Sequence, residues 1–463
     1  MRRLVPFIAS TLIAASCTGS GPSTTIAATA APPASTVPSS STTSMPPPQT
    51  TSPQPTTAIT STTTTTTLPD DVDPEVAAAL AAQIDELVAV TERIRGLPFV
   101  EPPKVSFLSH DMLDVRIRDI LAASLDPEDA ALQASLLTLL GLVAEGTDLG
   151  ALYEDLYAEQ VLGFYDGDTV ELVVAADSAE LSATSKVTLV HELIHALTDQ
   201  HFAFHDRHAD ALDADAFDEA EALLALAEGD ATYFQFIYTQ EELSIFELLE
   251  LAAETIGADS PVFDGAPKVV QDQLLFPYDK GFAFVDRLVG GGGIAAVDEA
   301  YQNPPLTTRD IFHPDRFLSG RPRRTIEIPR ADLDGWQVYE EGTYGEFGLW
   351  QLFTGSFDDG YRTQLATGWE DDGYRIYRRD SDVAFVLLSQ MVDEDNAVEL
   401  AQALLVMARN QMGAGQGVDR AGGVEFPGAP YAFVDRVGDQ VVFVASSDSD
   451  AGVSLRLLVG AGG

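Results

Sequence analysis

Cysteine is almost absent from this sequence of 463 residues, which contains only Cys17. A single cysteine excludes an intramolecular disulfide and a metal site built from several thiolates. Basic residues are scarce as well: 26 Lys and Arg stand against 72 Asp and Glu, and the formal net charge is -46. Such an acidic surface repels nucleic acids and anionic lipids, so we expect neither as a partner. We interpret the acidity as a means of staying soluble outside the cell rather than of attracting basic substrates.

The apolar run at the N-terminus, residues 4–15, is too short for a stable membrane span. Two arginines precede it and small residues lead to Cys17, which is typical of an export signal. Residues 13–17, Ile-Ala-Ala-Ser-Cys, resemble a bacterial lipobox, in which the cysteine becomes the lipid-bearing N-terminus. We therefore predict a signal peptide at 1–16 and a lipid anchor at Cys17, on the outer face of the cytoplasmic membrane, as the only membrane contact. The alternative is ordinary secretory cleavage.

Residues 17–70 consist largely of Ser, Thr, Pro and Ala. Such a segment cannot bury a core, so we expect a disordered tether. With about 50 residues, its root-mean-square reach is roughly 40 Å. A tether directly after a lipid-bearing cysteine would hold a folded domain away from a membrane surface.

Residues 71–335 are predicted to form a mostly helical domain with a small antiparallel sheet, so the fold class is α+β. Apolar periodicity and capping signals predict helices at 71–97, at 182–199, at 215–238, at 278–289 and two between 112 and 143. Strands are expected at 105–108, 160–166 and 169–174, the last two joined by the turn Asp166-Gly167-Asp168.

Residues 336–463 show a different pattern, typical of a small α+β module. Helices are expected at 345–353 and 396–410, and strands at 374–378, 383–391, 431–437, 441–445 and 453–459. Nothing in this module points to chemistry.

The run from His191 to His195 reads His-Glu-Leu-Ile-His. On a helix, it sets two imidazoles one turn apart on one edge, with the carboxylate of Glu192 beside them, which is the arrangement that a catalytic zinc ion needs. The alternative without a metal is a surface helix with two incidental histidines.

A catalytic zinc ion needs a third protein ligand and an open position for water. Glu228 lies on an apolar stripe of the next predicted helix, where a carboxylate is costly unless a cation compensates it. Glu221 lies two turns earlier on nearly the same face of the helix, so its orientation does not exclude it as the third ligand. The choice between them stays open on this ground.

His201 is a further candidate, because His191, His195 and His201 have the spacing of the metzincin motif. That motif has glycine where Thr198 stands, and continued helix would turn His201 away from His195. We interpret His201 as a structural or rim residue, and the two later histidines, His205 and His208, as solvated.

Residues 191–199 resemble the active helix of thermolysin-type gluzincins, whose third zinc ligand is a glutamate on the following helix. Residues 228–232 are similar to the segment that supplies this ligand in a bacterial group of exported zinc metallopeptidases, and segments like 163–166 and 304–308, with a following His-Pro pair, recur there. The resemblance covers roughly residues 80–410. It implies a zincin-like core, one zinc ion held by His191, His195 and Glu228, and a peptide or protein substrate.

Thr232 departs from thermolysin, which has an acidic residue at the matching place. Asp199 and Asp230 are therefore candidates for accepting a hydrogen bond from the histidine ring nitrogens that do not bind the metal. In the mechanism that the resemblance implies, Glu192 is the general base that activates water. His313 is the first candidate to stabilise the oxyanion, followed by Tyr278, expected at the start of its helix, and Tyr233.

The strand at 169–174 is a candidate for binding an extended peptide along its edge. Calcium is conceivable at the acidic clusters 166–168 and 393–395, although neither has a full calcium-loop spacing. The function predicted is thus an extracytoplasmic zinc metalloendopeptidase. The alternative is a non-catalytic cell-envelope binding module that keeps zinc as a structural brace.

Overall fold

A computed structural model describes residues 65–67, 74–124, 126–160, 163–167, 169–175, 180–257, 260–320, 326, 328–420 and 422–459. The predicted signal peptide, Cys17 and most of the predicted tether lie outside these residues. The exception is Thr65–Thr67, which forms strand β1 beside β2 (Lys104–Leu108). Among the helices described, none is long and apolar enough to cross a membrane.

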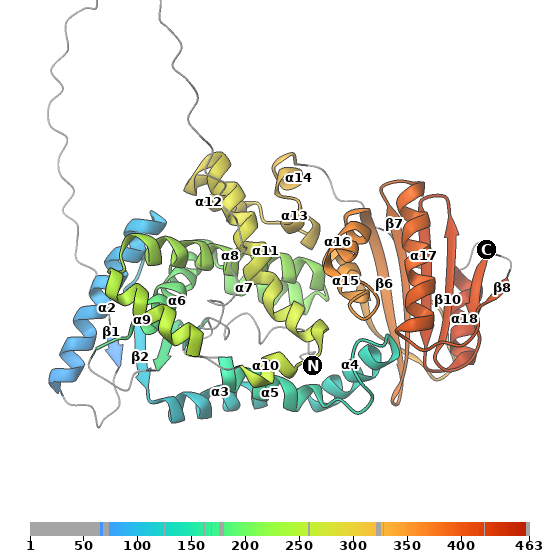
Figure 1. Cartoon of the computed structure of the whole chain (residues 1–463), viewed down its shortest axis with the longest axis horizontal. Helices are drawn as coiled ribbons and strands as arrows, with labels where there is room; N and C mark the ends of the chain where they lie inside the picture. Colours follow the sequence, from blue (N-terminus) through green and yellow to red (C-terminus); the bar gives the residue numbers. More distant parts are fainter. Residues whose placement is uncertain are drawn as a thin grey trace, which may run out of the picture.

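Helices dominate the part of the chain before position 336, which lies beside the C-terminal sheet along the long axis of the molecule (Figure 1). They are α2 (Pro74–Arg95), α3 (His110–Ser124), α4 (Pro127–Leu139), α5 (Leu149–Gln160), α6 (Ala183–Phe202), α7 (Phe204–Asp213), α8 (Phe217–Glu241), α9 (Ile245–Gly257), α10 (Pro261–Gly265), α11 (Lys268–Gly292), α12 (Ile294–Gln302), α13 (Thr308–Phe312) and α14 (Pro314–Leu318). Each predicted helix is present.

The start of α11 differs from the prediction. The helix begins at Lys268, so Tyr278 lies inside it and not at its start. The buried positions Val269, Val270 and Leu274 continue the same apolar face on the N-terminal side of Pro277. The proline removes one helical hydrogen bond, but the packed face on both sides of it keeps the helix continuous.

The small sheet of the helical part has the strand order β1-β2-β4-β3, with β4 at Glu171–Ala175 and β3 at Gly163–Asp166. Strands β1, β2 and β4 run parallel, and β3 pairs antiparallel with β4. The predicted antiparallel sheet is therefore mixed. The hairpin is confirmed, but the prediction that its second strand has a free edge is wrong, because β4 is paired on both sides. Among the strands that the structure describes, β1 and β3 are the two end strands of this sheet.

The C-terminal sheet is antiparallel and seven-stranded, with the order β5-β6-β7-β11-β10-β9-β8. Its strands are β5 (Gln337–Gly342), β6 (Trp369–Arg379), β7 (Asp382–Met391), β8 (Val418–Arg420), β9 (Gly423–Phe426), β10 (Tyr431–Val437) and β11 (Gln440–Ser446). Helices α15 (Gly345–Leu352), α16 (Asp359–Thr367), α17 (Glu394–Asn410) and α18 (Ser449–Val459) accompany it. The α+β class is thus confirmed.

The strand predicted at 453–459 is wrong, since these residues belong to helix α18. The alternation of Val453, Leu455 and Leu457 suggested a strand, but the Asp448 side chain accepts a hydrogen bond from the backbone N–H of Ala451 and so caps a helix start. Local capping outweighs a short alternating pattern here.

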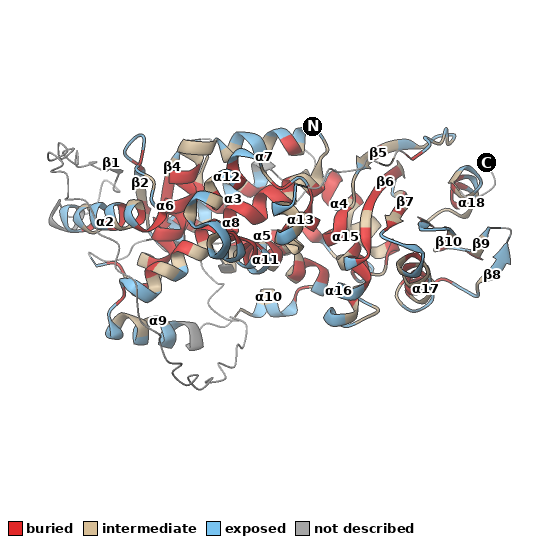
Figure 2. Ribbon diagram, turned by 90° about the horizontal axis from the view of Figure 1, so that it is seen from above, coloured by how far each residue is buried: buried red, intermediate tan, exposed pale blue. Residues whose placement is uncertain are grey.

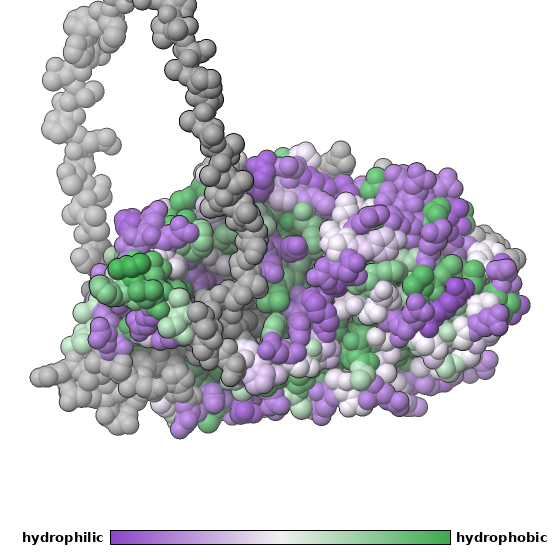
Figure 3. Space-filling model, viewed as in Figure 1, coloured by the Kyte–Doolittle hydropathy of each residue, from purple (hydrophilic) through white to green (hydrophobic). Residues whose placement is uncertain are grey.

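A single hydrophobic cluster crosses position 336. It joins Leu132 and Val269 of the helical part to Leu352, Phe385 and Phe443 of the C-terminal part. Figure 2 shows buried segments continuing from α8 and α11 into α15 and β6. Hydrophilic residues cover much of the face in Figure 3, in keeping with the acidic composition.

Helices α6 and α8 are fixed by local features that bear on the site. The Ser182 side chain accepts a hydrogen bond from the backbone N–H of Ser185 and starts α6, and Ala203 ends it in the left-handed conformation. Gly229 of α8 lies against Gly281 of α11, so closely that a Cβ on Gly229 would stand 2.2 Å from the carbonyl carbon of Gly281. Only glycine allows this approach.

Candidate metal centre

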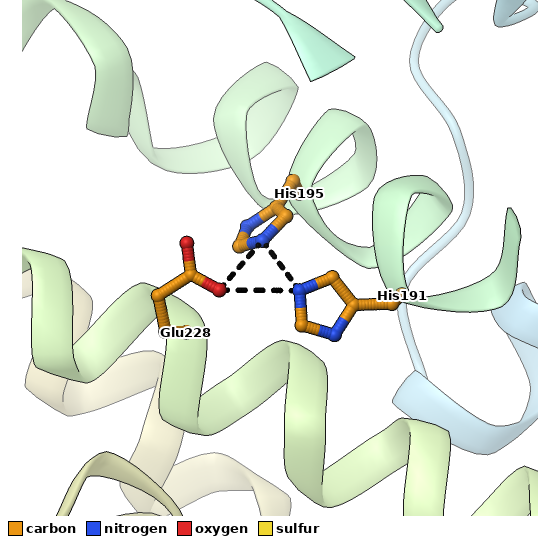
Figure 4. Close-up of side chains that lie close together, drawn as sticks. All are labelled: His191, His195 and Glu228. Carbon is orange, nitrogen blue, oxygen red and sulfur yellow. Dashed lines mark hydrogen bonds and ion pairs between the residues drawn. The ribbon is translucent and has the colours of Figure 1, made fainter. Parts of the chain in front are cut away.

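The side chains of His191, His195 and Glu228 point toward one another between α6 and α8 (Figure 4). The Nε2 atoms of the two histidines are 3.0 Å apart, and Glu228 Oε2 lies 3.1 Å from His191 Nε2 and 3.3 Å from His195 Nε2. All three residues are buried, at 1%, 8% and 2% exposure in the same order. Helical spacing thus brings the three predicted ligands to one point.

Hydrogen bonds alone explain this triangle poorly. If both imidazole Nε2 atoms carried a hydrogen, two donors would face each other across 3.0 Å; if His191 Nε2 carried none, its lone pair would face the Glu228 carboxylate across 3.1 Å. A tetrahedral ion that binds nitrogen and oxygen ligands at about 2.0–2.1 Å holds them about 3.3 Å apart. The three ligand atoms therefore fit a divalent metal ion. Within the part of the chain that the structure describes, this is the one group of His, Cys, Asp or Glu that could hold one.

Gln235 determines the tautomer of the His191 imidazole. Its Oε1 atom lies 3.0 Å from His191 Nδ1. An amide oxygen only accepts, so Nδ1 donates, and in the neutral ring the lone pair then sits on Nε2, facing the other two ligands. Sequence reasoning missed Gln235. The signal was its position seven residues after Glu228, two turns along the same face of α8.

Glu192 is buried next to this centre, at 2% exposure. Its Oε2 accepts a hydrogen bond of 2.8 Å from the backbone N–H of Tyr165 in β3. Burial raises the pKa of Glu192 to about 8; His191 opposes the shift, Glu228 adds to it and the Tyr165 N–H opposes it. Because Tyr165 N points to Glu192 and not to β4, the outer edge of β3 faces α6, and Glu192 occupies the Tyr165 donor there.

The candidates for oxyanion stabilisation have different surroundings. Tyr278 is buried, and its ring stacks on that of His191 with 6.1 Å between centroids. His313 lies between α13 and α14, with its Nε2 2.9 Å from Glu346 Oε1. Tyr233 packs against Phe282. Of the three, Tyr278 is the one with a ring contact to a metal-centre histidine.

The rival third ligands lie elsewhere. His201 Nε2 is 2.7 Å from the carbonyl oxygen of Pro98 at an exposed position. Glu221 interacts electrostatically with Tyr153 and Tyr157 of α5. Neither belongs to the group around Glu228.

The prediction that His208 is solvated is wrong. It is buried at 4% exposure and stacks on Phe204, because α7 folds back onto α8. Burial, followed by the neighbouring His205, lowers its pKa to about 4, while Glu228 opposes the shift. His208 is therefore neutral at physiological pH, within electrostatic reach of a metal-centre carboxylate.

Asp199 and Asp230, the candidates for supporting the histidines, and Asp393 of the acidic cluster 393–395 have other partners. Asp230 forms a buried ion pair with Arg95 of α2, with Nε and Oδ2 3.1 Å apart. Asp199 accepts a hydrogen bond of 2.9 Å from the Tyr165 hydroxyl. Asp393 caps α17, 2.9 Å from the backbone nitrogen of Asn396. In cluster 166–168, Asp168 lies outside the described residues.

The comparisons with known proteins concern other parts of the chain or are distant. A family described as a domain of unknown function (DUF8575) matches residues 336–456, which contain the C-terminal sheet and not the metal centre. No curated protein matches the chain. Among solved structures, it is similar to a proposed hydrolase with a novel fold from Chloroflexus aurantiacus, with 18% identity and a TM-score of 0.35, over 54% of this chain and 93% of that chain. Such a likeness assigns neither fold nor activity.

Proposed function

We propose that this protein is a zinc-dependent metallopeptidase of the gluzincin type. The observation that carries the proposal is the triangle of His191, His195 and Glu228 atoms with the buried carboxylate of Glu192 beside it. Two imidazoles and one carboxylate oxygen are a donor set that zinc binds in hydrolases. When bound, the ion supplies a water of lowered pKa and polarises the carbonyl to be attacked.

Glu192 serves as the general base in this proposal. It takes the proton of the attacking water and delivers it to the leaving amine. The hydrogen bond from the Tyr165 N–H holds its carboxylate in place.

The substrate is proposed to be an extended peptide. The outer edge of β3 does not supply the pairing surface, because Glu192 occupies the Tyr165 N–H and residues 163–165 are buried. The Tyr278 hydroxyl, carried by the ring stacked on His191, is our first candidate for stabilising the oxyanion. His313 is the second. Export and lipid anchoring at Cys17 belong to the same proposal and agree with a peptidase acting outside the cytoplasm.

A second candidate function is a non-catalytic binding module with a structural zinc site. The observation in its favour is burial, since the three ligands are between 1% and 8% exposed. Structural zinc sites are closed by four protein ligands, whereas catalytic sites keep a position for water. The two candidate functions predict different roles for Glu192: it is needed for peptide cleavage in a peptidase, and at most for folding in a binding module.

The test uses the chain from residue 70 to 463 and the substitution Glu192→Gln, which keeps the shape of the side chain. We expect one equivalent of zinc in both proteins and cleavage of a peptide library reduced about 10²–10⁴-fold in the variant, because the base is lost. Glu241→Gln, at an exposed position of α8, is the matched control and should cleave as wild type does. Full activity in Glu192→Gln would contradict the proposal.

The third ligand is tested separately by zinc retention. We expect Glu228→Ala to lose zinc during dialysis against a chelator, while Glu221→Ala and His201→Ala keep it. Zinc loss in His201→Ala alone would instead favour metzincin-like ligation.

A further inference from the structure

A cavity of about 170 Å³ lies where the helical part meets the C-terminal sheet. Its walls come from α4, α8 and α11 on one side, and from β5, β6 and α15 on the other. None of the residues of the metal centre lines it. The cavity therefore needs an explanation of its own.

Aliphatic, aromatic and acidic side chains line this cavity together. Asp218, Glu221 and Glu340 contribute carboxyl groups, and the rings include those of Tyr344 and Phe347. Among the described residues that form its wall, there is no Lys, Arg or His. Carboxylates together with aromatic faces are the surroundings in which proteins bind organic cations, through ion pairing and cation–π attraction.

Two acceptor atoms of the lining lack a donor. Glu221 Oε2 and Gln133 Oε1 are both buried without a hydrogen bond. A buried acceptor left without a partner among the described residues costs stability, so an N–H donor that reached either atom would be bound favourably. Burial, with a further contribution from Asp218, raises the pKa of Glu221 to about 8.

The cavity is close to the metal centre along two helices. Glu221 precedes Glu228 by seven residues on the same face of α8, which corresponds to about 10 Å along the axis. On α11, Gln273 lines the cavity and Tyr278, five residues later, stacks on His191. An extended peptide rises about 3.3 Å per residue, so about three residues span the distance from the metal centre.

We propose that this cavity recognises a compact organic cation, a guanidinium or alkylammonium group, with Glu221 as the residue that pairs with it. The source of the cation rests on the proposed function. We propose that it is the basic side chain of a peptide substrate, about three residues from the cleaved bond. A free small amine is the other source of the same chemistry.

The first experiment measures binding without relying on catalysis. Agmatine, which carries a guanidinium group on a short chain, is titrated calorimetrically into the chain from residue 70 to 463. We expect one saturable site, with a dissociation constant at least tenfold higher in Glu221→Gln and unchanged in Glu241→Gln. N-butylurea, which has a similar length and carries no charge, should not bind. Equal affinity in wild type and Glu221→Gln, or no binding by wild type at millimolar agmatine, would overturn the proposal.

A second variant guards against misfolding. If Glu221→Gln does not reach the wild-type circular dichroism spectrum, Gln133→Met takes its place, since it removes the other unpartnered acceptor and keeps the length of the side chain. It should weaken agmatine binding severalfold. Unchanged binding in a folded Gln133→Met would count against the site.

The second experiment identifies the source of the cation. Cleavage of a peptide library is compared with cleavage of the same library in which citrulline replaces arginine. We expect kcat/KM at least tenfold higher for the arginine peptides in wild type, and no such preference in Glu221→Gln. Agmatine binding without any peptide cleavage would support the cation site and contradict the proposed function. Cleavage without preference or agmatine binding would overturn this inference alone.

Discussion

The hydrogen bond between Gln235 and His191 shows how one residue outside the ligand set can govern the centre. It fixes the ring so that Nε2 faces Glu228 and His195. Partners of this kind typically change metal affinity about 10–100-fold when they are removed. We expect Gln235→Leu to lower zinc affinity by that factor in competition with a chromophoric chelator. Gln240→Leu, exposed on the same helix, should have no effect. Unaltered affinity in Gln235→Leu would show that the ring needs no such support.

A second prediction for a single residue concerns Glu221 and pH. Its pKa is about 8 in the folded chain, against about 4.3 in an unfolded one, so the folded state keeps a proton that the unfolded state releases. The free energy of unfolding therefore falls as the pH rises from about 5 to about 8, and this contribution is constant at higher pH. Asp218 is the charged neighbour that adds to the shift.

The measurement is the urea midpoint of unfolding at pH 5, 7 and 9. Glu221→Gln cannot release the proton, so we expect it to lose less stability over this range than wild type. Glu241→Gln should follow wild type, because its carboxyl group is exposed. Parallel curves for wild type and Glu221→Gln would rule out a raised pKa.

At the scale of elements, the contact between α8 and α11 positions Glu228. A Cβ on Gly281 would stand 2.1 Å from the carbonyl oxygen of Ala225, a backbone atom that cannot move without shifting α8. We expect Gly281→Ala to lower the free energy of unfolding by a few kcal/mol, about the range for overpacking, and to weaken zinc binding through Glu228.

The matched control for this substitution is Gly290→Ala, in the same helix, where a Cβ would meet nothing within 4 Å. It should be neutral or stabilising by up to about 1 kcal/mol, since alanine is the better helix former. Urea unfolding and chelator competition on both variants provide the measurements. If Gly281→Ala is destabilised but binds zinc as tightly as wild type, the contact between α8 and α11 does not position Glu228.

The sequence predicted elements whose signals are local. The run from His191 to His195 lies on the predicted helix, although this helix is buried on all sides from Val187 to Thr198. The apolar stripe of the next helix left Glu228 and Glu221 open, and the resemblance to gluzincins favoured Glu228, which lies with the two histidines. What the sequence could not predict depends on residues far apart in the chain. Tyr165 meets Glu192 only because β3 lies at the sheet edge, and His208 is buried only because α7 folds onto α8. No periodicity within one element carries such information.

The whole molecule raises the question of how its two predicted parts depend on each other. The sequence places a boundary at 335–336, yet one hydrophobic cluster contains residues from both sides of it, such as Leu139 and Met407. The cavity with Glu221 is also walled by both parts. Exposing such a cluster to water would cost about 25 cal/mol for every Å² of apolar surface. The two parts should therefore stabilise each other.

This coupling predicts the unfolding of the intact chain. We expect the protein from residue 70 to 463 to unfold in one calorimetric transition, because neither part keeps its apolar surface buried once the other has melted. Removing zinc with a chelator should lower the midpoint of that same transition, since a ligand bound only to the folded state stabilises it by RT ln(1 + [L]/Kd). If the parts were independent, a second transition, insensitive to the chelator, would remain in place. Residues 70–335 produced alone should then also fold, whereas a shared core leaves them aggregated.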